Sequence, residues 1–213
     1  MIVAAAAAAP GPAAAQNGNT AADAAEPANA AAFAARSTSP EGHPVIGPAG
    51  ARDVLTLFID YQCPVCPRAA REMDRLVVEM AGSLRVEIRQ NPLPMHRDAF
   101  GAAAAALAAQ RQGKFWEYHA LLIASRRHDR EALIALADRA GCEREAFLRD
   151  LQDPDLAARV RADMASAAEA KAQATPGFLI NGHTVTGWAS YEWIKGIVLK
   201  HRSSPMPLSH SSP

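Results

Sequence analysis

The sequence has few cysteines, no excess of charge of either sign and no long hydrophobic run. Its 213 residues include three cysteines, too few for a small scaffold held together by disulfides. The 22 basic and 22 acidic residues balance, whereas nucleic-acid or anionic-membrane binding usually needs a cationic excess. No stretch reaches the roughly 18 consecutive apolar residues of a membrane span. A basic nucleic-acid binder, a collagen and a transmembrane protein are therefore excluded.

The two ends of the chain have the composition of disordered segments. Of the first 36 residues 19 are alanine, and residues 1–42 lack the apolar periodicity that would offset the entropy of ordering them. The first part resembles a signal peptide, with an apolar stretch and an A-x-A pattern at residues 13–15, but without a basic start. It indicates export to the periplasm or cell envelope, with a plain linker as the alternative. Residues 202–213 are rich in serine and proline, which predicts a disordered tail.

A strand, a helix and a second strand are expected after the leader. Residues 53–59 form a β-branched and aromatic run long enough for a buried strand. Between residues 69 and 80 apolar side chains recur at helical spacing, with charged side chains on the opposite face. Residues 85–89 alternate charged and apolar side chains, which is typical of a half-buried strand. This order predicts a right-handed parallel crossover.

The second half of the chain is mainly helical in pattern and ends in a hairpin and a helix. Residues 97–172 carry helical periodicity, broken by glycine and proline. Asn181-Gly182 joins two β-like runs, a strong signal for a type I′ hairpin turn. Residues 191–200 form a last amphipathic stretch. Together these patterns predict an α/β domain over residues 43–201, with an α-helical insertion at about 95–174 between the two halves of its sheet.

The chemistry is carried by Cys63-Pro64-Val65-Cys66, directly after the first predicted strand. A helix N-terminus favours a thiolate over a thiol, and the thiolate is the attacking species in disulfide exchange. We therefore expect Cys63 to be the exposed nucleophile and Cys66 the more buried resolving partner. The alternatives are a merely structural pair and half a zinc site, the latter weakened because the chain has only one further cysteine, Cys142, and no close histidine pair. The chemistry requires no metal or organic cofactor.

The segment FIDYQCPVC, followed by an amphipathic helix, resembles the active site of the DsbA-like thiol-disulfide oxidoreductases of the thioredoxin superfamily. The resemblance runs through GKFWEYH at residues 113–119 to TPGFLING at 175–182, and covers about residues 45–200. It implies a thioredoxin-like fold with a helical insertion. It also implies that Pro176 is cis and faces the cysteines, and that Thr175 offers backbone hydrogen bonds to a bound peptide. The implied partners are client proteins with thiols or disulfides and a redox partner that recycles the dithiol.

Three residues depart from the family pattern. Leu57 occupies a position that often holds a buried acid, so help with proton transfer must come from Asp60 or water; we interpret Asp60 as a strand-end residue that bonds nearby backbone. Pro67 has no N–H for the first intrahelical bond, which predicts that the helix begins there and activates Cys63 weakly. Gly177 stands where relatives often carry threonine or alanine, which predicts a looser loop.

Two other functions stay open at this point. One is a glutathione-transferase-kappa-like or isomerase-like enzyme on the same fold, and the other is a thioredoxin-like module that binds peptides without turnover. The direction of redox chemistry is not determined by the sequence. Cys142 is expected to be a buried unreactive thiol, with an intermolecular disulfide as the minor alternative. Structural roles are expected for the other conspicuous residues: Phe115, Trp116 and Tyr118 as the core of the insertion, residues 126–130 as a solvated turn, and Trp188 and Tyr191 as packing residues or the edge of a peptide groove.

Overall fold

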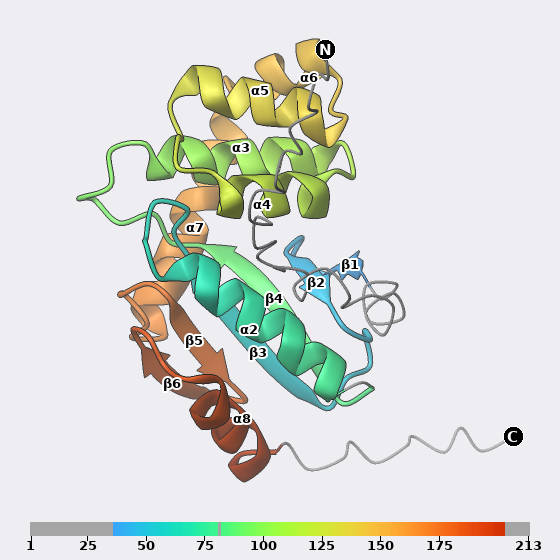
Figure 1. Cartoon of the computed structure of the whole chain (residues 1–213), viewed down its shortest axis with the longest axis vertical. Coiled ribbons are helices and arrows are strands. Elements are labelled where there is room, and N and C mark those ends of the chain that lie inside the picture. Colours follow the sequence, from blue (N-terminus) through green and yellow to red (C-terminus); the bar gives the residue numbers. More distant parts are fainter. Residues whose placement is uncertain (1–35, 81, 203–213) are drawn as a thin grey trace, which may run out of the picture.

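The computed structural model describes residues 36–80 and 82–202 and has a six-stranded sheet in the order β1-β2-β4-β3-β5-β6 (Figure 1). β3 and β4 are parallel, with Leu57 opposite Ile88, and the other neighbours are antiparallel. The predicted parallel crossover is therefore confirmed. The strands are β1 (Arg36–Thr38), β2 (Pro44–Ile46), β3 (Asp53–Ile59), β4 (Leu84–Gln90), β5 (Gly177–Ile180) and β6 (His183–Thr186).

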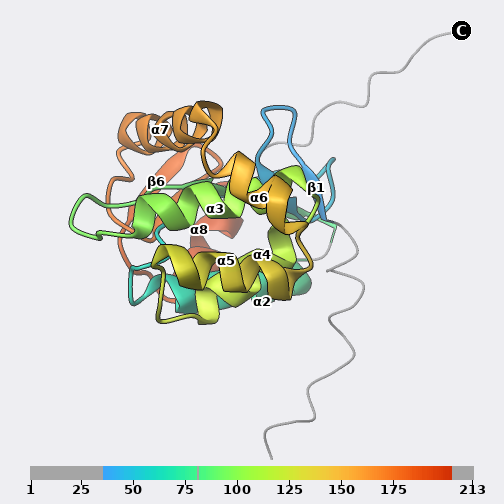
Figure 2. The same cartoon turned by 90° about the horizontal axis from the view of Figure 1, so that it is seen from above.

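Helices cover both faces of the sheet and form a separate layer beyond one edge. α2 (Cys66–Glu79) and α8 (Tyr191–Lys200) pack together on one face, and α7 (Pro154–Glu169) contacts β4 from the other (Figures 1 and 2). The insertion between β4 and β5 contains α3 (Ala99–Arg111), α4 (Phe115–Ala124), α5 (Arg130–Ala140), α6 (Arg144–Asp150) and α7. A thioredoxin-like α/β fold with a helical insertion is thus confirmed. In the part of the chain that the structure describes, the helices are too short or too polar to cross a membrane.

The hairpin between β5 and β6 has the predicted turn. Asn181 and Gly182 both have positive φ, 47° and 86°, as a type I′ turn requires. The Asn181 side chain also accepts a hydrogen bond from the Val54 N–H at 2.8 Å. The hairpin is in this way fixed to the start of β3.

The boundary of the predicted leader differs from the structure. Arg36–Thr38 form strand β1, which pairs with β2 through Ser37 opposite Val45. The three β1 side chains are exposed and polar or charged, so no hydrophobic pattern marks this strand in the sequence. The sheet therefore begins before residue 43. The rest of the leader, residues 1–35, and the tail after Arg202 lie outside the described residues.

One edge of the sheet collects the segments that carry the chemistry. Ile59, at the end of β3, lies opposite Gln90 at the end of β4, and Phe58 lies opposite Gly177 at the start of β5. The carboxyl ends of two parallel strands share an edge with the amino end of their antiparallel neighbour. The Cys63 loop, the loop after β4 and the Thr175–Pro176 loop consequently meet there.

Candidate active site

The two cysteines lie on either side of the N-terminus of α2. Cys63 belongs to the loop after β3, Val65 is the N-cap and Cys66 is the first residue of the helix. The Cys66 N–H donates to the Cys63 carbonyl at 3.2 Å. The helix thus begins one residue before the predicted start at Pro67, and proline is tolerated in the first turn because its missing N–H has no intrahelical partner there.

Both cysteines are more enclosed than the sequence suggested. Cys63 is 5% exposed and Cys66 is 0% exposed, and both are free thiols in the structure. The order of exposure agrees with the expected roles, but Cys63 is not an open surface residue. The sulfur atom of a client must therefore reach below the protein surface to contact Cys63 Sγ.

The two thiols shift each other's pKa in opposite directions. A hydrogen bond from the Cys66 thiol is the largest cause that lowers the pKa of Cys63 to about 5, against the opposing effect of burial. Thr175 and the backbone N–H groups of Val65 and Cys66 lower it further, by less. The pKa of Cys66 is raised, first by the hydrogen bond with Cys63 and then by burial. The activation of Cys63 therefore depends more on its partner thiol than on the helix.

Alkylation of the reduced protein tests this origin of the low pKa. We expect Cys63 to react as a thiolate above about pH 5 and to lose reactivity below it, because its folded pKa is depressed. Cys66→Ala should raise the apparent pKa of Cys63 toward its ordinary value, whereas Cys66→Ser keeps a hydrogen-bond donor and should raise it less. The measurement is the rate of iodoacetamide modification against pH. Equal pKa values in the alanine and serine variants would refute the partner-thiol origin.

The predicted peptide-binding residues lie beside the nucleophile. The Thr175–Pro176 peptide bond is cis, as the resemblance implies. Cys63 Sγ is 3.3 Å from the Thr175 carbonyl oxygen, and Thr175 and Pro176 are both buried. The structure thus brings together Cys63, Cys66, Thr175 and Pro176 from distant parts of the chain.

Gly177 is held tightly, and the predicted loosening of its loop is wrong. A Cβ on Gly177 would lie 2.6 Å from the Ala172 carbonyl oxygen and 2.9 Å from that of Ala174. The Asn91 side chain donates to the carbonyl oxygens of Ala172 and Gln173, at 3.4 and 3.3 Å. Glycine is present because the preceding backbone occupies the space of a side chain.

Asp60 fastens the Cys63 loop to the loop after β4. Its Oδ1 accepts the Gln62 N–H at 2.7 Å, and its Oδ2 accepts the Leu93 N–H at 2.7 Å. His96 Nδ1 is also 2.7 Å from Oδ2. The interpretation of Asp60 as a backbone-bonding residue is confirmed, while its pairing with His96 was missed. This buried carboxylate thus has three polar partners, all of them in the Cys63 loop and the segment after β4.

A second buried contact joins the Cys63 loop to the helical insertion. Tyr61 Oη lies 2.9 Å from His119 Nδ1, and the His119 ring stacks on Phe115 with centroids 5.3 Å apart. Burial lowers the pKa of His119 to about 4, so its imidazole is neutral at physiological pH. The expected core role is confirmed for Phe115 and Tyr118, both of which are buried.

A pocket of about 460 Å³ opens beside Cys63. One side is the Cys63 loop and the start of α2, and the other is the connection between α4 and α5. Residues 126–130 were expected to be a solvated turn, and Arg126, Arg127 and Arg130 are indeed exposed. Arg126 and the buried His128 nevertheless line the pocket, a placement that only the tertiary structure reveals.

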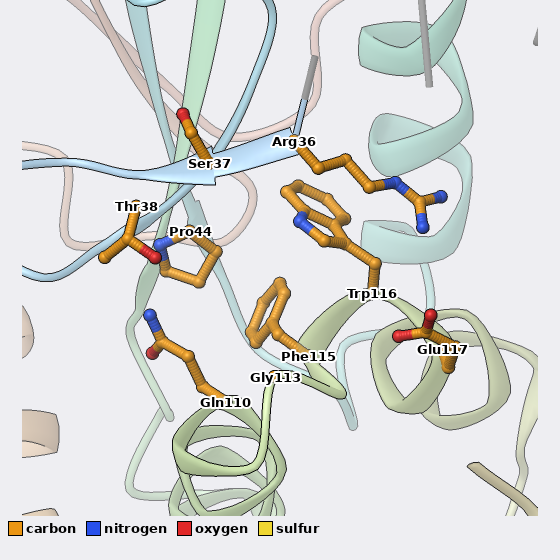
Figure 3. Close-up of a pocket in the computed structure, with 9 residues that line it drawn as sticks. All are labelled: Arg36, Ser37, Thr38, Pro44, Gln110, Gly113, Phe115, Trp116 and Glu117. Carbon is orange, nitrogen blue, oxygen red and sulfur yellow. The ribbon is translucent and has the colours of Figure 1, made fainter. Parts of the chain in front are cut away.

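A separate hollow of about 230 Å³ lies between β1 and the α3–α4 junction (Figure 3). Figure 3 shows the side chains of Arg36 and Trp116 next to each other, with the guanidinium carbon 5.4 Å from the ring centroid. None of its lining residues also lines the Cys63 pocket, and they include no cysteine or histidine. This hollow is therefore separate from the dithiol site.

Three other residues considered in the sequence have packing contacts. The Arg75 guanidinium lies 4.0 Å from the ring centroid of the buried Tyr191, and Arg68 lies 4.4 Å from that of the partly exposed Trp188. Cys142 is half-buried and not buried as expected, and burial raises its pKa. Its function stays a prediction.

Two cysteines lie three positions apart at the start of a helix, beside a loop with a cis-proline, on a sheet with both parallel and antiparallel strands. This combination defines a thioredoxin-fold protein with a dithiol site. Residues 38–200 match the family model described as thioredoxin, and the chain belongs to this family. The resemblance stated from the sequence is thereby confirmed at the level of family and fold.

Solved structures share this fold. The structure is similar to a thioredoxin-like oxidoreductase from Silicibacter pomeroyi DSS-3, with a TM-score of 0.68, 28% identity, and coverage of 74% of this chain and 91% of that one. BdbD from Bacillus subtilis has a TM-score of 0.66 and 21% identity, with coverage of 77% and 95%. The thiol-disulfide exchange protein α-DsbA2 from Wolbachia pipientis has a TM-score of 0.66 and 16% identity, with coverage of 74% and 86%. At identities of 21% and 16%, the similarity to the last two structures shows a shared fold and no more.

Curated relatives are much longer than this chain. The Na⁺/H⁺ antiporter NhaA of Herminiimonas arsenicoxydans is 35% identical over 150 residues, which are 70% of this chain and 24% of the antiporter. NhaA 3 of Salinispora tropica is 33% identical over 162 residues, 75% of this chain and 25% of the antiporter. The chain thus spans about a quarter of the length of these relatives, and the match to that part does not transfer antiport to it.

Proposed function

We propose that this protein is a thiol-disulfide oxidoreductase that exchanges disulfides with client proteins through Cys63 and Cys66. The observation that carries the proposal is the Cys63 sulfur, which has a lowered pKa, a thiol partner in Cys66 and a position 3.3 Å from the Thr175 carbonyl. A thiol with a lowered pKa is ionised at neutral pH and is a good leaving group in thiol exchange, and the contact with Thr175 places it beside the cis-proline loop. Thr175 then serves as a backbone partner for the client peptide.

The oxidation of a client follows from the geometry in two steps. A client thiolate attacks Cys63 Sγ of the Cys63–Cys66 disulfide, the bond between the two cysteines breaks, and Cys66 departs with the electron pair and takes up a proton. A second client thiolate attacks the client sulfur of this mixed disulfide, and Cys63 leaves as a thiolate. The client loses two electrons and the dithiol gains them. A redox partner with a disulfide must then reoxidise the pair.

The lowered pKa of Cys63 sets the expected direction of this chemistry. Stabilising the Cys63 thiolate stabilises the reduced pair, which makes its disulfide a stronger oxidant. We expect a reduction potential well above that of thioredoxin, between about −200 and −120 mV. The measurement is equilibration in glutathione buffers with alkylation as the readout. A value near −270 mV would reject the oxidising direction.

The same titration separates the proposed function from its rivals. A dithiol that shows no reversible two-electron couple would reject disulfide exchange. Peptide binding by such a protein would then indicate the non-catalytic module. A glutathione-dependent activity that survives Cys66→Ser would indicate the glutathione-transferase-kappa-like or isomerase-like enzyme.

An oxidising role suits a compartment outside the cytoplasm, where disulfides persist. We propose the periplasm or cell envelope as its location. The support is the signal-like start of the sequence together with the shared fold of a periplasmic thioredoxin-like protein from Salmonella enterica serovar Typhimurium, with a TM-score of 0.59 and 22% identity. Fractionation of cells that express the full chain tests this placement.

A further inference from the structure

The residues that line the pocket beside Cys63 include basic side chains but no acidic ones. Two parts of the chain form it, the active-site segment and the α4–α5 connection, and between them they contribute one arginine, one histidine and no carboxylate. The pocket therefore presents positive charge next to the reactive sulfur. Its lining residues are Tyr61, Gln62, Cys63, Pro64, Pro67, Ile123, Ala124, Ser125, Arg126 and His128.

The two adjacent arginines of this connection differ in their partners. Arg127 forms a two-point ion pair with Asp129, at 2.9 and 3.1 Å, and its backbone N–H and carbonyl both bond Ser125 Oγ. Its charge is thus matched within the turn. Arg126, in contrast, makes no ion pair with any residue in 36–80 or 82–202.

Other charges do not cancel that of Arg126 inside the pocket. Two acidic side chains lie next to the lining without forming part of it: Asp60 accepts the Gln62 N–H at 2.7 Å, and Asp98 lies 3.5 Å from Gln62 Nε2. Arg130, four residues after Arg126, lines a different hollow on the insertion. Arg126, which is exposed, is the one permanently charged residue among those that line the pocket beside Cys63.

We infer that this pocket receives the carboxylate of an aspartate or glutamate that lies within two residues of the client's reactive cysteine. The inference rests on the proposed function and names the class of client that it favours. Two residues of extended chain span about 7 Å, so a neighbour of a cysteine bound at Cys63 falls within a pocket that Cys63 itself lines. The carboxylate of glutathione has the same chemistry and is the competing source.

The expected effect is moderate and acts on association. A solvent-exposed ion pair changes an equilibrium or a rate by about two- to fivefold. Because rim charges act mainly through electrostatic attraction before contact, the effect should fall as salt screens it, with little left at about 1 M ionic strength.

The test compares peptides that differ only next to the cysteine. Oxidised protein is mixed in a stopped-flow instrument with two-cysteine peptides that carry Asp, Asn or Lys beside the first cysteine. We expect Arg126→Gln to slow the Asp peptide about threefold, to leave the Asn peptide unchanged and to accelerate the Lys peptide. Each rate is expressed relative to that of the unsubstituted protein with the same peptide, which cancels the intrinsic reactivity of the peptide thiol.

Arg130→Gln is the matched control, because it removes the same charge four residues further along, at the start of α5, without changing the lining of the pocket. It should alter none of the three rates. Arg126→Glu should reverse the preference, so that the Lys peptide reacts faster than the Asp peptide. Circular dichroism melting of each variant confirms that the fold is intact.

The outcomes distinguish this inference from the function on which it rests. Normal exchange with the Asn peptide, but no change of the Asp rate in Arg126→Gln, would overturn the acidic-client inference alone. Exchange with none of the peptides would overturn the proposed function as well. If glutathione oxidation, and no peptide rate, depends on Arg126, the pocket recognises glutathione and the acidic-client inference is wrong.

Discussion

Replacement of Cys63 by serine is expected to lower the rate of disulfide exchange by at least about a thousandfold. Serine has no thiolate and cannot form the mixed disulfide through which electrons move. The Cys66 sulfur cannot take over, because it is fully buried and its pKa is raised. The measurement is the rate at which the protein oxidises a dithiol peptide with glutathione disulfide as the terminal oxidant.

Two further cysteine variants make this prediction specific. Cys142→Ser should leave the rate unchanged, because this half-buried thiol lies in the α5–α6 connection and does not line the Cys63 pocket. Cys66→Ser keeps the nucleophile but removes the resolving thiol, so mixed disulfides with a client should accumulate and be visible by mass. If Cys63→Ser retained a tenth or more of the activity, the assignment of the nucleophile would be incorrect.

Local sequence patterns predicted the parts of the site that adjacent residues build. A buried strand followed by Cys63-Pro64-Val65-Cys66 and an amphipathic helix predicted where both sulfurs lie, and the structure agrees within one residue at the helix start. Asn181-Gly182 predicted the hairpin for the same reason, since a two-residue turn depends on the conformations of those residues. The cis bond before Pro176 came from the family resemblance rather than from any local pattern.

Contacts between distant segments could not be predicted in this way. Tyr61 and His119 are 58 residues apart and Asp60 and His96 are 36 apart, and polar pairs of this kind carry no periodic signal. Arg126 had the pattern of an exposed turn, and only the packing of the α4–α5 connection against the Cys63 loop places it in the pocket. The residue proposed to determine which clients are preferred could therefore be found only from the tertiary structure.

The cause of the low Cys63 pKa was missed although both residues lie in one short segment, because the sequence does not show that the two thiols form a hydrogen bond. Pro67 predicted a helix start at residue 67, one residue later than the structure has it, and with it a weak activation of Cys63. The pKa is nevertheless lowered to about 5, mainly because the Cys66 thiol donates a hydrogen bond. A side-chain contact between neighbours in space thus outweighs the helix N-terminus, which contributes through two backbone N–H groups.

Substitution of Gly177 by alanine is expected to destabilise the protein by about 2–3 kcal/mol, in the upper range for overpacking. The new methyl group would meet the Ala172 and Ala174 carbonyl oxygens at 2.6 and 2.9 Å. These are backbone atoms, and the Asn91 side chain holds the neighbouring carbonyls in place, so the strain is relieved only by moving residues 172–176. Urea unfolding measures the loss of stability, and the rate of exchange measures the displacement of Thr175 from Cys63.

Gly196→Ala is the matched control for this prediction, because a Cβ at Gly196 meets nothing within 4 Å. Gly196 lies in the interior of α8 with an exposed surface, where alanine should stabilise the fold by about 0.5–1 kcal/mol. The two substitutions add the same methyl group and should change stability in opposite directions. If Gly177→Ala kept both full stability and full exchange activity, the 172–174 backbone would be free to move aside. The loop beside Pro176 would then be as loose as the departure of Gly177 from the family pattern predicts.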